Sequence, residues 1–123
     1  PQHAHDLTVD LMRSASPRPT AIVCASDEIA MGACLALTEL GLGVPEDVSV
    51  VGIDDHTMAG LFSLTTVRQD FVAQGEQAAA LLLESIAAQE RSAFQPQRVV
   101  IDTELIVRGS TAPPRRQDSD GSG

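Results

Sequence analysis

Two short polar clusters in this sequence carry its most chemically useful side chains, Ser26-Asp27-Glu28 and Asp54-Asp55-His56. A carboxylate can accept hydrogen bonds from two neighbouring hydroxyl groups, so Asp54 suits a ligand with vicinal hydroxyls, such as a sugar or polyol. Ser26 could offer a hydroxyl to the same ligand. The competing interpretation for both residues is helix capping, which explains Ser26 well from its spacing alone.

The other members of these clusters have structural explanations. Negative charge in the first turn of a helix accounts for Asp27 without a ligand. Asp55 is expected to cap local backbone amides, and a lone His56 beside two Asp residues is more often a surface or capping residue. Adjacent carboxylates in one loop are not the opposed pair that a glycosidase needs. We therefore expect no catalytic residues, and the chain is not predicted to be an enzyme.

Two apolar runs, Thr20–Ala25 and Val48–Ile53, position the polar clusters. The first is continuously apolar and rich in β-branched residues, which predicts a strand covered on both faces, and the second also has the pattern of a buried strand. Between them, apolar residues repeat at helical spacing from Ile29 to Leu40, and Gly41 is expected to end that helix. A strand-helix-strand unit of this kind places its strands parallel. Both polar clusters should then emerge at one edge of the sheet, where open α/β sheets bind ligands.

The remaining elements are expected to be simpler. A short helix after a cap at Asp6 should end before Ser16-Pro17, and residues 64–69 predict a further strand. A helix over residues 72–89 carries an apolar stripe. Short strands are predicted at residues 98–101 and 104–108. Residues 112–123, rich in Pro, Arg, Asp, Ser and Gly, are expected to be flexible.

Composition limits the classes of function. The net charge is −9 and the sequence contains no Lys, so a surface for nucleic-acid phosphates is not evident in this piece. Cys24 and Cys34 lie among apolar neighbours and are expected to be buried free thiols of a reducing, cytoplasmic compartment. His3 and His5 lack further ligands at metal-binding spacing, so we expect no metal and no cofactor. No apolar run reaches the roughly 20 residues of a membrane helix, and no signal peptide is evident.

Four ordered segments together resemble the effector domain of the LacI/GalR family of bacterial transcription regulators. They are residues 19–33, 40–55, 64–69 and 103–111, so the resemblance covers most of the chain. It implies an α/β fold, a parallel-sheet βαβ lobe of the periplasmic-binding-protein-like (type I) fold, with only the C-terminal lobe present.

The resemblance also implies a domain organisation. Residues 1–70 would form the C-terminal lobe of the effector-binding domain, and residues 71–95 a crossover helix of the N-terminal lobe. Residues 96–111 would be returning strands, and residues 112–123 a disordered tail. Since the crossover helix would lack its natural partner, the isolated chain is expected to self-associate or to be marginally stable.

Site residues follow from the same resemblance. The residue matching Asp54 contacts ligand in the family, the one matching Asp27 lies near the cleft, and an aromatic residue matching Phe71 packs on bound sugar. The alternative for Phe71 is ordinary packing in the hinge between the lobes. Gln69 could hydrogen-bond to the ligand or only hold together the segment that crosses between the lobes. Many sugar-binding relatives carry Asn where this sequence has Ser26, which leaves the identity of the sugar open.

A second group of residues matches the surface through which relatives form homodimers. Met31 lies on the helix after Asp27, and Leu61 and Phe62 lie on the loop after Asp55. Plain core packing is the alternative; it is favoured for Cys34 of the same helix and is less expected for Phe62.

The predicted function is the ligand-binding and dimerisation part of a LacI-type regulator that responds to a sugar or small metabolite. Contact with operator DNA would be made only through an N-terminal domain outside this chain, and a homodimer is expected. The alternative is a periplasmic sugar-binding protein of a transport system, which shares the fold. Residues 44–50 and 107–111 look like the regulators rather than the transport proteins.

Overall fold

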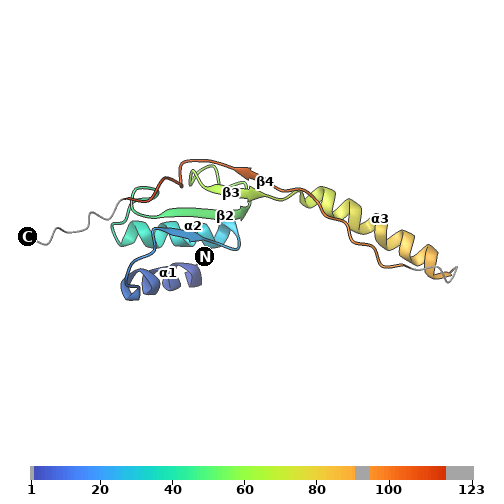
Figure 1. Cartoon of the computed structure of the whole chain (residues 1–123), viewed down its shortest axis with the longest axis horizontal. Helices are drawn as coiled ribbons and strands as arrows, with labels where there is room; N and C mark the ends of the chain where they lie inside the picture. The colour runs from blue at the N-terminus through green and yellow to red at the C-terminus, as the bar shows by residue number, and fades with distance from the viewer. Residues whose placement is uncertain (1, 91–94, 116–123) are drawn as a thin grey trace, which may run out of the picture. The chain divides into compact units, whose positions relative to one another are not determined.

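The computed structural model describes residues 2–90 and 95–115. In chain order its elements are α1 (Gln2–Ser14), β1 (Ala21–Val23), α2 (Asp27–Glu39), β2 (Ser49–Asp54), β3 (Thr65–Arg68), α3 (Phe71–Glu90) and β4 (Glu104–Ile106) (Figure 1). The chain divides into two compact units. The first unit comprises Pro1–Arg68 with Leu105–Gly123, and the second comprises Gln69–Glu104.

The predicted strand-helix-strand unit is confirmed. β1 and β2 are parallel, with Ala21 opposite Ser49 and Val23 opposite Val51. β3 is parallel to β2 on its other side, and the sheet order is β1-β2-β3-β4. The fold is therefore mixed α/β with a mostly parallel sheet.

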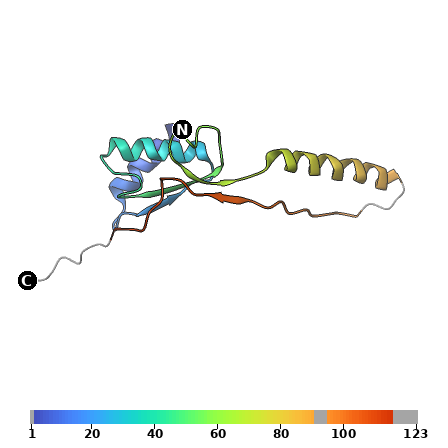
Figure 2. The same cartoon turned by 90° about the horizontal axis from the view of Figure 1, so that it is seen from above.

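Helix α2 packs on β2, and α1 packs on α2, so that α2 is sandwiched between the sheet and α1 (Figures 1 and 2). Small residues of α2, Ala30 and Ala33, are fully buried and let the helix approach Val50 of β2 closely. Gly52 of β2 is required for the same reason, because a Cβ added there would lie 2.1 Å from a carboxylate oxygen of Asp27. The core is thus aliphatic and tightly spaced.

The expectation that the first strand is covered on both faces is wrong. β1 is an edge strand, and Val23 leaves 75% of its surface exposed while Ile22 packs towards the core. A continuous apolar run predicts a strand but does not by itself distinguish an edge strand from a central one.

Helix α1 also begins earlier than predicted. It starts at Gln2, so Asp6 lies inside the helix and is not its cap. The Gln2 side chain donates to the Asp6 carboxylate one turn later, at 3.1 Å, which supports the extra turn. Its end at Ser14, before Ser16-Pro17, agrees with the prediction.

In the second unit, α3 (Phe71–Glu90) confirms the long helix, and the apolar side chains Leu82 and Leu83 are exposed. The strand predicted at residues 98–101 is wrong, since these residues form no regular structure. A strand exists only where its backbone is paired, and the chain described here offers this segment no neighbouring strand. Of the strand predicted at residues 104–108, only the part that forms β4 is present.

Residues 112–115 have no regular structure, and the rest of the predicted flexible tail, residues 116–123, lies outside the described residues. Within the part of the chain that the structure describes, no helix has the length and apolar character to cross a membrane.

Candidate functional site

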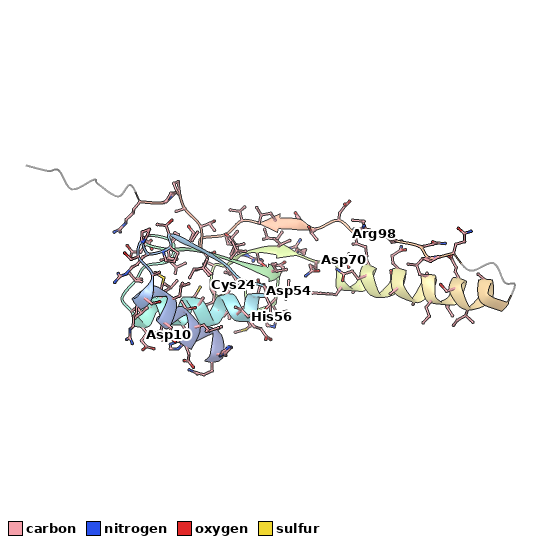
Figure 3. The ribbon with its side chains drawn as sticks, turned by 60° about the horizontal axis from the view of Figure 1, so that its bottom comes forward. Asp10, Cys24, Asp54, His56, Asp70 and Arg98 are labelled. Atoms are coloured by element: carbon pink, nitrogen blue, oxygen red, sulfur yellow. The ribbon has the colours of Figure 1, made fainter. Side chains whose placement is uncertain are left out.

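The carboxyl edge of the sheet carries the predicted polar clusters. Because β1, β2 and β3 are parallel, Ser26 just beyond β1, Asp54 at the end of β2 and Arg68 at the end of β3 share this edge. Asp54 and Arg68 are register partners. Figure 3 shows Asp54 and His56 close together, with Cys24 at the same end. The predicted common edge is therefore present.

Ser26 is the N-cap residue of α2. Its backbone is extended (φ −152°, ψ 162°), and its Oγ accepts a hydrogen bond from the backbone N–H of Ile29 at 3.3 Å. The cap explains why α2 begins at Asp27. The side chain is half-buried at the rim, so its hydroxyl hydrogen can still be donated outward.

Asp27 is completely buried. One carboxylate oxygen accepts a 2.5 Å hydrogen bond from the Thr66 hydroxyl, and the other accepts a 2.7 Å bond from the backbone N–H of His56. Gly52 leaves room for this carboxylate beneath β2. Asp27 therefore connects α2 to β3 and to the loop after β2, a role that the dipole argument from sequence did not reveal.

The backbone turns sharply at the end of β2. Asp54 has φ 115° and Asp55 has φ 52°, conformations that residues other than glycine rarely adopt. Such conformations cost on the order of 1–3 kcal/mol and persist where the surroundings fix them, often at binding sites. The Asp27 bond to His56 and the contacts of Asp55 are the restraints that hold this turn.

Asp55 lies between two arginines. Its carboxylate accepts hydrogen bonds from Arg68 Nε at 2.8 Å and from Arg108 Nη2 at 2.7 Å. The Arg108 guanidinium, followed by that of Arg68, holds the pKa of Asp55 below its ordinary value. The structural role expected for Asp55 is therefore present, but its partners are guanidinium groups and not local backbone amides.

His56 is exposed, and its Nδ1 accepts a hydrogen bond from the backbone N–H of Met58 at 3.1 Å. This agrees with the surface or capping role expected for His56.

The segment after β4 contains structural residues that sequence reasoning missed. The Ser110 hydroxyl donates to the carbonyl of Val50 at 2.6 Å and accepts from the N–H of Thr65 at 2.8 Å. Arg108 also donates to the carbonyl of Leu64 at 2.8 Å. These bonds tie the segment after β4 to the first residues of β2 and β3. The only sequence signal was the motif in residues 107–111.

Gln69 and Phe71, the other predicted ligand residues, belong to the second unit. The Gln69 Oε1 accepts a hydrogen bond from Gln74 Nε2 at 3.3 Å. Asp70 caps α3, because its Oδ1 accepts from the N–H of Ala73 at 2.8 Å. Phe71 follows as the first residue of the helix and is exposed.

Both cysteines are buried and unpaired, as expected. Burial raises the pKa of Cys24 and raises that of Cys34 to about 11, so both are neutral thiols at physiological pH. His5 bonds to Asp6 at 3.1 Å and to Glu39 at 2.8 Å. Among the residues that the structure describes, no group of three or more His, Cys, Asp or Glu could hold a metal ion.

The predicted pairing residues differ in exposure. Leu61 is 78% exposed, whereas Met31 and Phe62 are half-buried and Phe62 packs against the core. Leu35 of α2 and Met58 of the loop after β2 are also exposed. Cys34 lies in the core, in agreement with the packing role favoured for it.

Comparisons with known proteins agree with this architecture. Residues 2–111 match the model of the periplasmic binding protein-like domain. The HTH-type transcriptional repressor PurR of Haemophilus influenzae (strain PittEE) is 44% identical over 94 residues, which are 75% of this chain and 28% of the relative. The chain thus spans little more than a quarter of the length of that relative.

Solved structures give the same result. A Lac repressor dimer bound to operator and the anti-inducer ONPF matches 89% of this chain and 37% of its own, with 30% identity and a TM-score of 0.76. A LacI family transcriptional regulator from Enterococcus faecium, with bound ribose, matches 93% of this chain and 41% of its own, with 31% identity and a TM-score of 0.76.

Proposed function

The chain belongs to the periplasmic binding protein-like domain family, among the LacI-family transcriptional regulators, and from this premise we propose its role. It is the ligand-binding and dimerisation part of a DNA-binding regulator that responds to a sugar or small metabolite. The observation that carries the proposal is the parallel pairing of β1 and β2, which gives Ser26 and Asp54 one common edge.

At this edge Asp54 accepts hydrogen bonds from vicinal hydroxyls of the ligand, and Ser26 donates its hydroxyl hydrogen while remaining the cap of α2. The positive φ of Asp54 supports this role, because an unusual backbone conformation is retained where a side chain must be aimed. Asp27, whose oxygens are both bonded inside the protein, contributes by holding the loop at His56.

Gln69 and Phe71, which belong to the second unit, are the further ligand residues that we propose. Phe71 offers an exposed ring that can pack on the apolar face of a sugar. In the domain organisation proposed, residues 1–70 are the C-terminal lobe and residues 71–95 the crossover helix of the other lobe. Residues 96–111 return to the C-terminal lobe, and residues 112–123 are a tail.

Ligand binding at the edge would act on DNA by shifting the regulator between two arrangements of its lobes. The Lac repressor structure, a dimer bound to operator, supports a homodimer for this protein also. We place the pairing surface at Met31, Leu61 and Phe62, where Leu61 presents the largest exposed apolar area. Contact with DNA and a cytoplasmic location are proposed for the whole regulator. The alternative function, a periplasmic sugar-binding protein of a transport system, has less support.

The test is isothermal titration calorimetry of the full-length regulator that contains this chain, against a panel of sugars and purines. Once a ligand is found, Asp54→Asn should weaken its binding roughly 10- to 100-fold, since a hydrogen bond to a charged group contributes about 1.5–3 kcal/mol. Asp10→Asn, an equal charge change on exposed α1, should have no effect. Equal affinities for Asp54→Asn and the unaltered protein would exclude this edge as the ligand site.

A further inference from the structure

The second unit is joined to the first by two covalent connections. The chain leaves the first unit after Arg68, the last residue of β3, and returns to it at Leu105 in β4. A structural change that travels along the chain from one unit to the other must therefore pass through the end of β3 or through the segment at β4.

Asp55 is bonded to both of these places. Its Oδ2 atom accepts a hydrogen bond from Nε of Arg68, which directly precedes the first connection, at 2.8 Å. Its Oδ1 atom accepts one from Nη2 of Arg108, which follows shortly after the second connection, at 2.7 Å. A single carboxylate therefore bridges the strand that leaves the first unit and the segment that returns to it.

The bridge is partly sheltered from water. The side chain of Asp55 is only 13% exposed and that of Arg108 is 26% exposed, whereas Arg68 is 50% exposed. Hydrogen bonds between a guanidinium group and a carboxylate are short, strong and directional, and salt screens them less where they are partly buried. The bond to Arg108 is therefore expected to be the stronger of the two, because exposed ion pairs contribute little.

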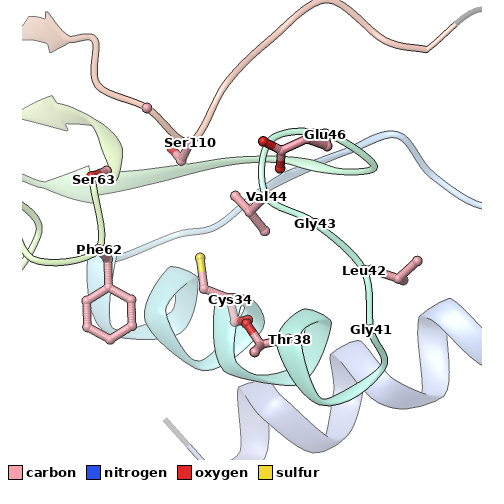
Figure 4. A pocket seen from close by; sticks show the side chains of 11 residues that line it. Cys34, Thr38, Gly41, Leu42, Gly43, Val44, Glu46, Phe62, Ser63 and Ser110 are labelled. Carbon is pink, nitrogen blue, oxygen red and sulfur yellow. The ribbon is translucent and has the colours of Figure 1, made fainter.

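Arg108 is itself held in place by further bonds. Its Nη1 donates to the carbonyl of Leu64 at 2.8 Å, and its backbone N–H donates to the hydroxyl of Thr65 at 3.0 Å. Further along the same segment, the hydroxyl of Ser110 donates to the carbonyl of Val50 in β2 at 2.6 Å (Figure 4). A guanidinium group fixed in this way cannot simply follow a carboxylate that moves.

Asp55 is also coupled to the residue before it, Asp54. Both have a positive φ, 115° at Asp54 and 52° at Asp55, and few conformations are open to such residues. The backbone N–H of Asp55 donates to the hydroxyl of Thr66 at 3.3 Å. A displacement of Asp54 would therefore be passed on to Asp55, because the turn has little freedom to absorb it.

We propose that Asp55 is a positioning residue that couples the ligand edge to both connections between the units. A ligand held by Asp54 changes the bonds of Asp55 to Arg68 and Arg108, and through them the placement of the segments that lead to and from the second unit. Networks of ion pairs and hydrogen bonds can carry coupling of this kind. The inference rests on the proposed function, because it takes Asp54 as the ligand contact.

The experiment uses Asp54→Asn as the perturbation and needs no ligand. In nuclear magnetic resonance spectra of the ¹⁵N-labelled chain, this change should shift the Nε–H resonance of Arg108 and the backbone amide resonances of residues 105–108. The shifts should be lost when the same change is made in an Asp55→Asn background. Both substitutions suit the turn, since Asn adopts a positive φ more readily than most residues.

Two results would overturn the proposal. If Asp54→Asn shifts no resonance of residues 105–108 in the otherwise unaltered chain, the edge is not coupled to the returning segment. If the shifts are equal with and without Asp55→Asn, the perturbation reaches Arg108 through space and Asp55 has no part in it.

Asp47→Asn provides the matched control background. Asp47 also pairs with an arginine, Arg115, at 3.1 Å, but it lies in the loop before β2. The response of Arg108 to Asp54→Asn should be retained in this background, and its loss there would refute a specific role for Asp55. The calorimetric test of the ligand edge is separate: a ligand affinity unaltered by Asp54→Asn refutes the proposed function, whereas a missing response at Arg108 refutes the coupling.

Discussion

The hydroxyl of Thr66 donates a 2.5 Å hydrogen bond to the fully buried carboxylate of Asp27. This contact joins β3 to the first turn of α2, and the Asp27 carboxylate lies against Gly52 of the neighbouring strand β2, which is opposite Thr66. The second oxygen of Asp27 fixes the loop after β2 through His56. One side chain thus links three segments of the candidate edge, and its loss should affect both folding and ligand binding.

Thr66→Val removes the donor while keeping the shape of the side chain. It should lower the free energy of unfolding by about 1–3 kcal/mol, because the buried Asp27 oxygen is left without its partner. Chemical denaturation followed by circular dichroism measures the change. Thr57→Val, at an exposed loop position, is the control and should alter stability by less than about 0.5 kcal/mol. Equal stability of Thr66→Val and the unaltered chain would contradict the role given to this contact.

Gly52→Ala tests the close approach of α2 to β2. The added methyl would lie 2.1 Å from a carboxylate oxygen of Asp27, so the helix must shift or the Thr66 bond must break. Overpacking of this kind typically costs about 1–3 kcal/mol. Gly60→Ala is the matched control, since a Cβ there has no atom within 4 Å. The midpoints of thermal unfolding should separate the two variants, and a Gly52→Ala midpoint as high as that of Gly60→Ala would refute the steric argument.

The ion pairs of Asp55 with Arg108 and Arg68 predict a loss of stability in acid. Arg108 and Arg68 lower the pKa of Asp55 in the folded state, so its contribution to stability is present above the ordinary pKa of 3.8. It is lost as the pH falls through the lowered folded value. The difference in unfolding free energy between the unaltered chain and Asp55→Asn should therefore be constant near pH 7 and shrink below pH 3.8. A difference that does not change with pH would show that the pair is not ionised.

The arrangement of the edge could be predicted from sequence because it depends on local patterns. Two apolar runs separated by one helical repeat define a parallel pair, and the residues after them must then meet at one edge. The cap at Ser26 was also readable from its spacing. The identity of Asp54 as a ligand residue depends on the resemblance and stays a prediction.

What could not be predicted depends on contacts between distant segments. No local pattern indicates that Thr66 faces Asp27, or that Ser110 bonds to Val50 60 residues earlier in the chain. The exposure of Val23 was missed because an apolar run has the same appearance at an edge and at the centre of a sheet. The segment 98–101 has β-branched residues, but strand propensity has no effect without a partner strand.

The contact between α1 and α2 predicts a pH dependence of the opposite sign. His5 bonds to Asp6 and to Glu39, and these hydrogen bonds raise the pKa of His5 above its ordinary value of 6.5. The protonated form is therefore favoured in the folded state, and the stability that it provides is fully present below pH 6.5. That stability is lost as the pH rises through the raised folded pKa. Chemical denaturation at a series of pH values from 5.5 to 9 compares the unaltered chain with His5→Gln.

The difference between these two proteins should be largest at pH 5.5 and decline towards pH 9, with a small amplitude because both carboxylates are exposed. Glu39→Gln should remove most of the pH dependence that involves α2. His3→Gln, at an exposed position of α1 without a carboxylate partner on α2 among the described residues, should keep the profile of the unaltered chain. A stabilisation by His5 that grows with pH would mean that the neutral imidazole is the form that holds α1 against α2.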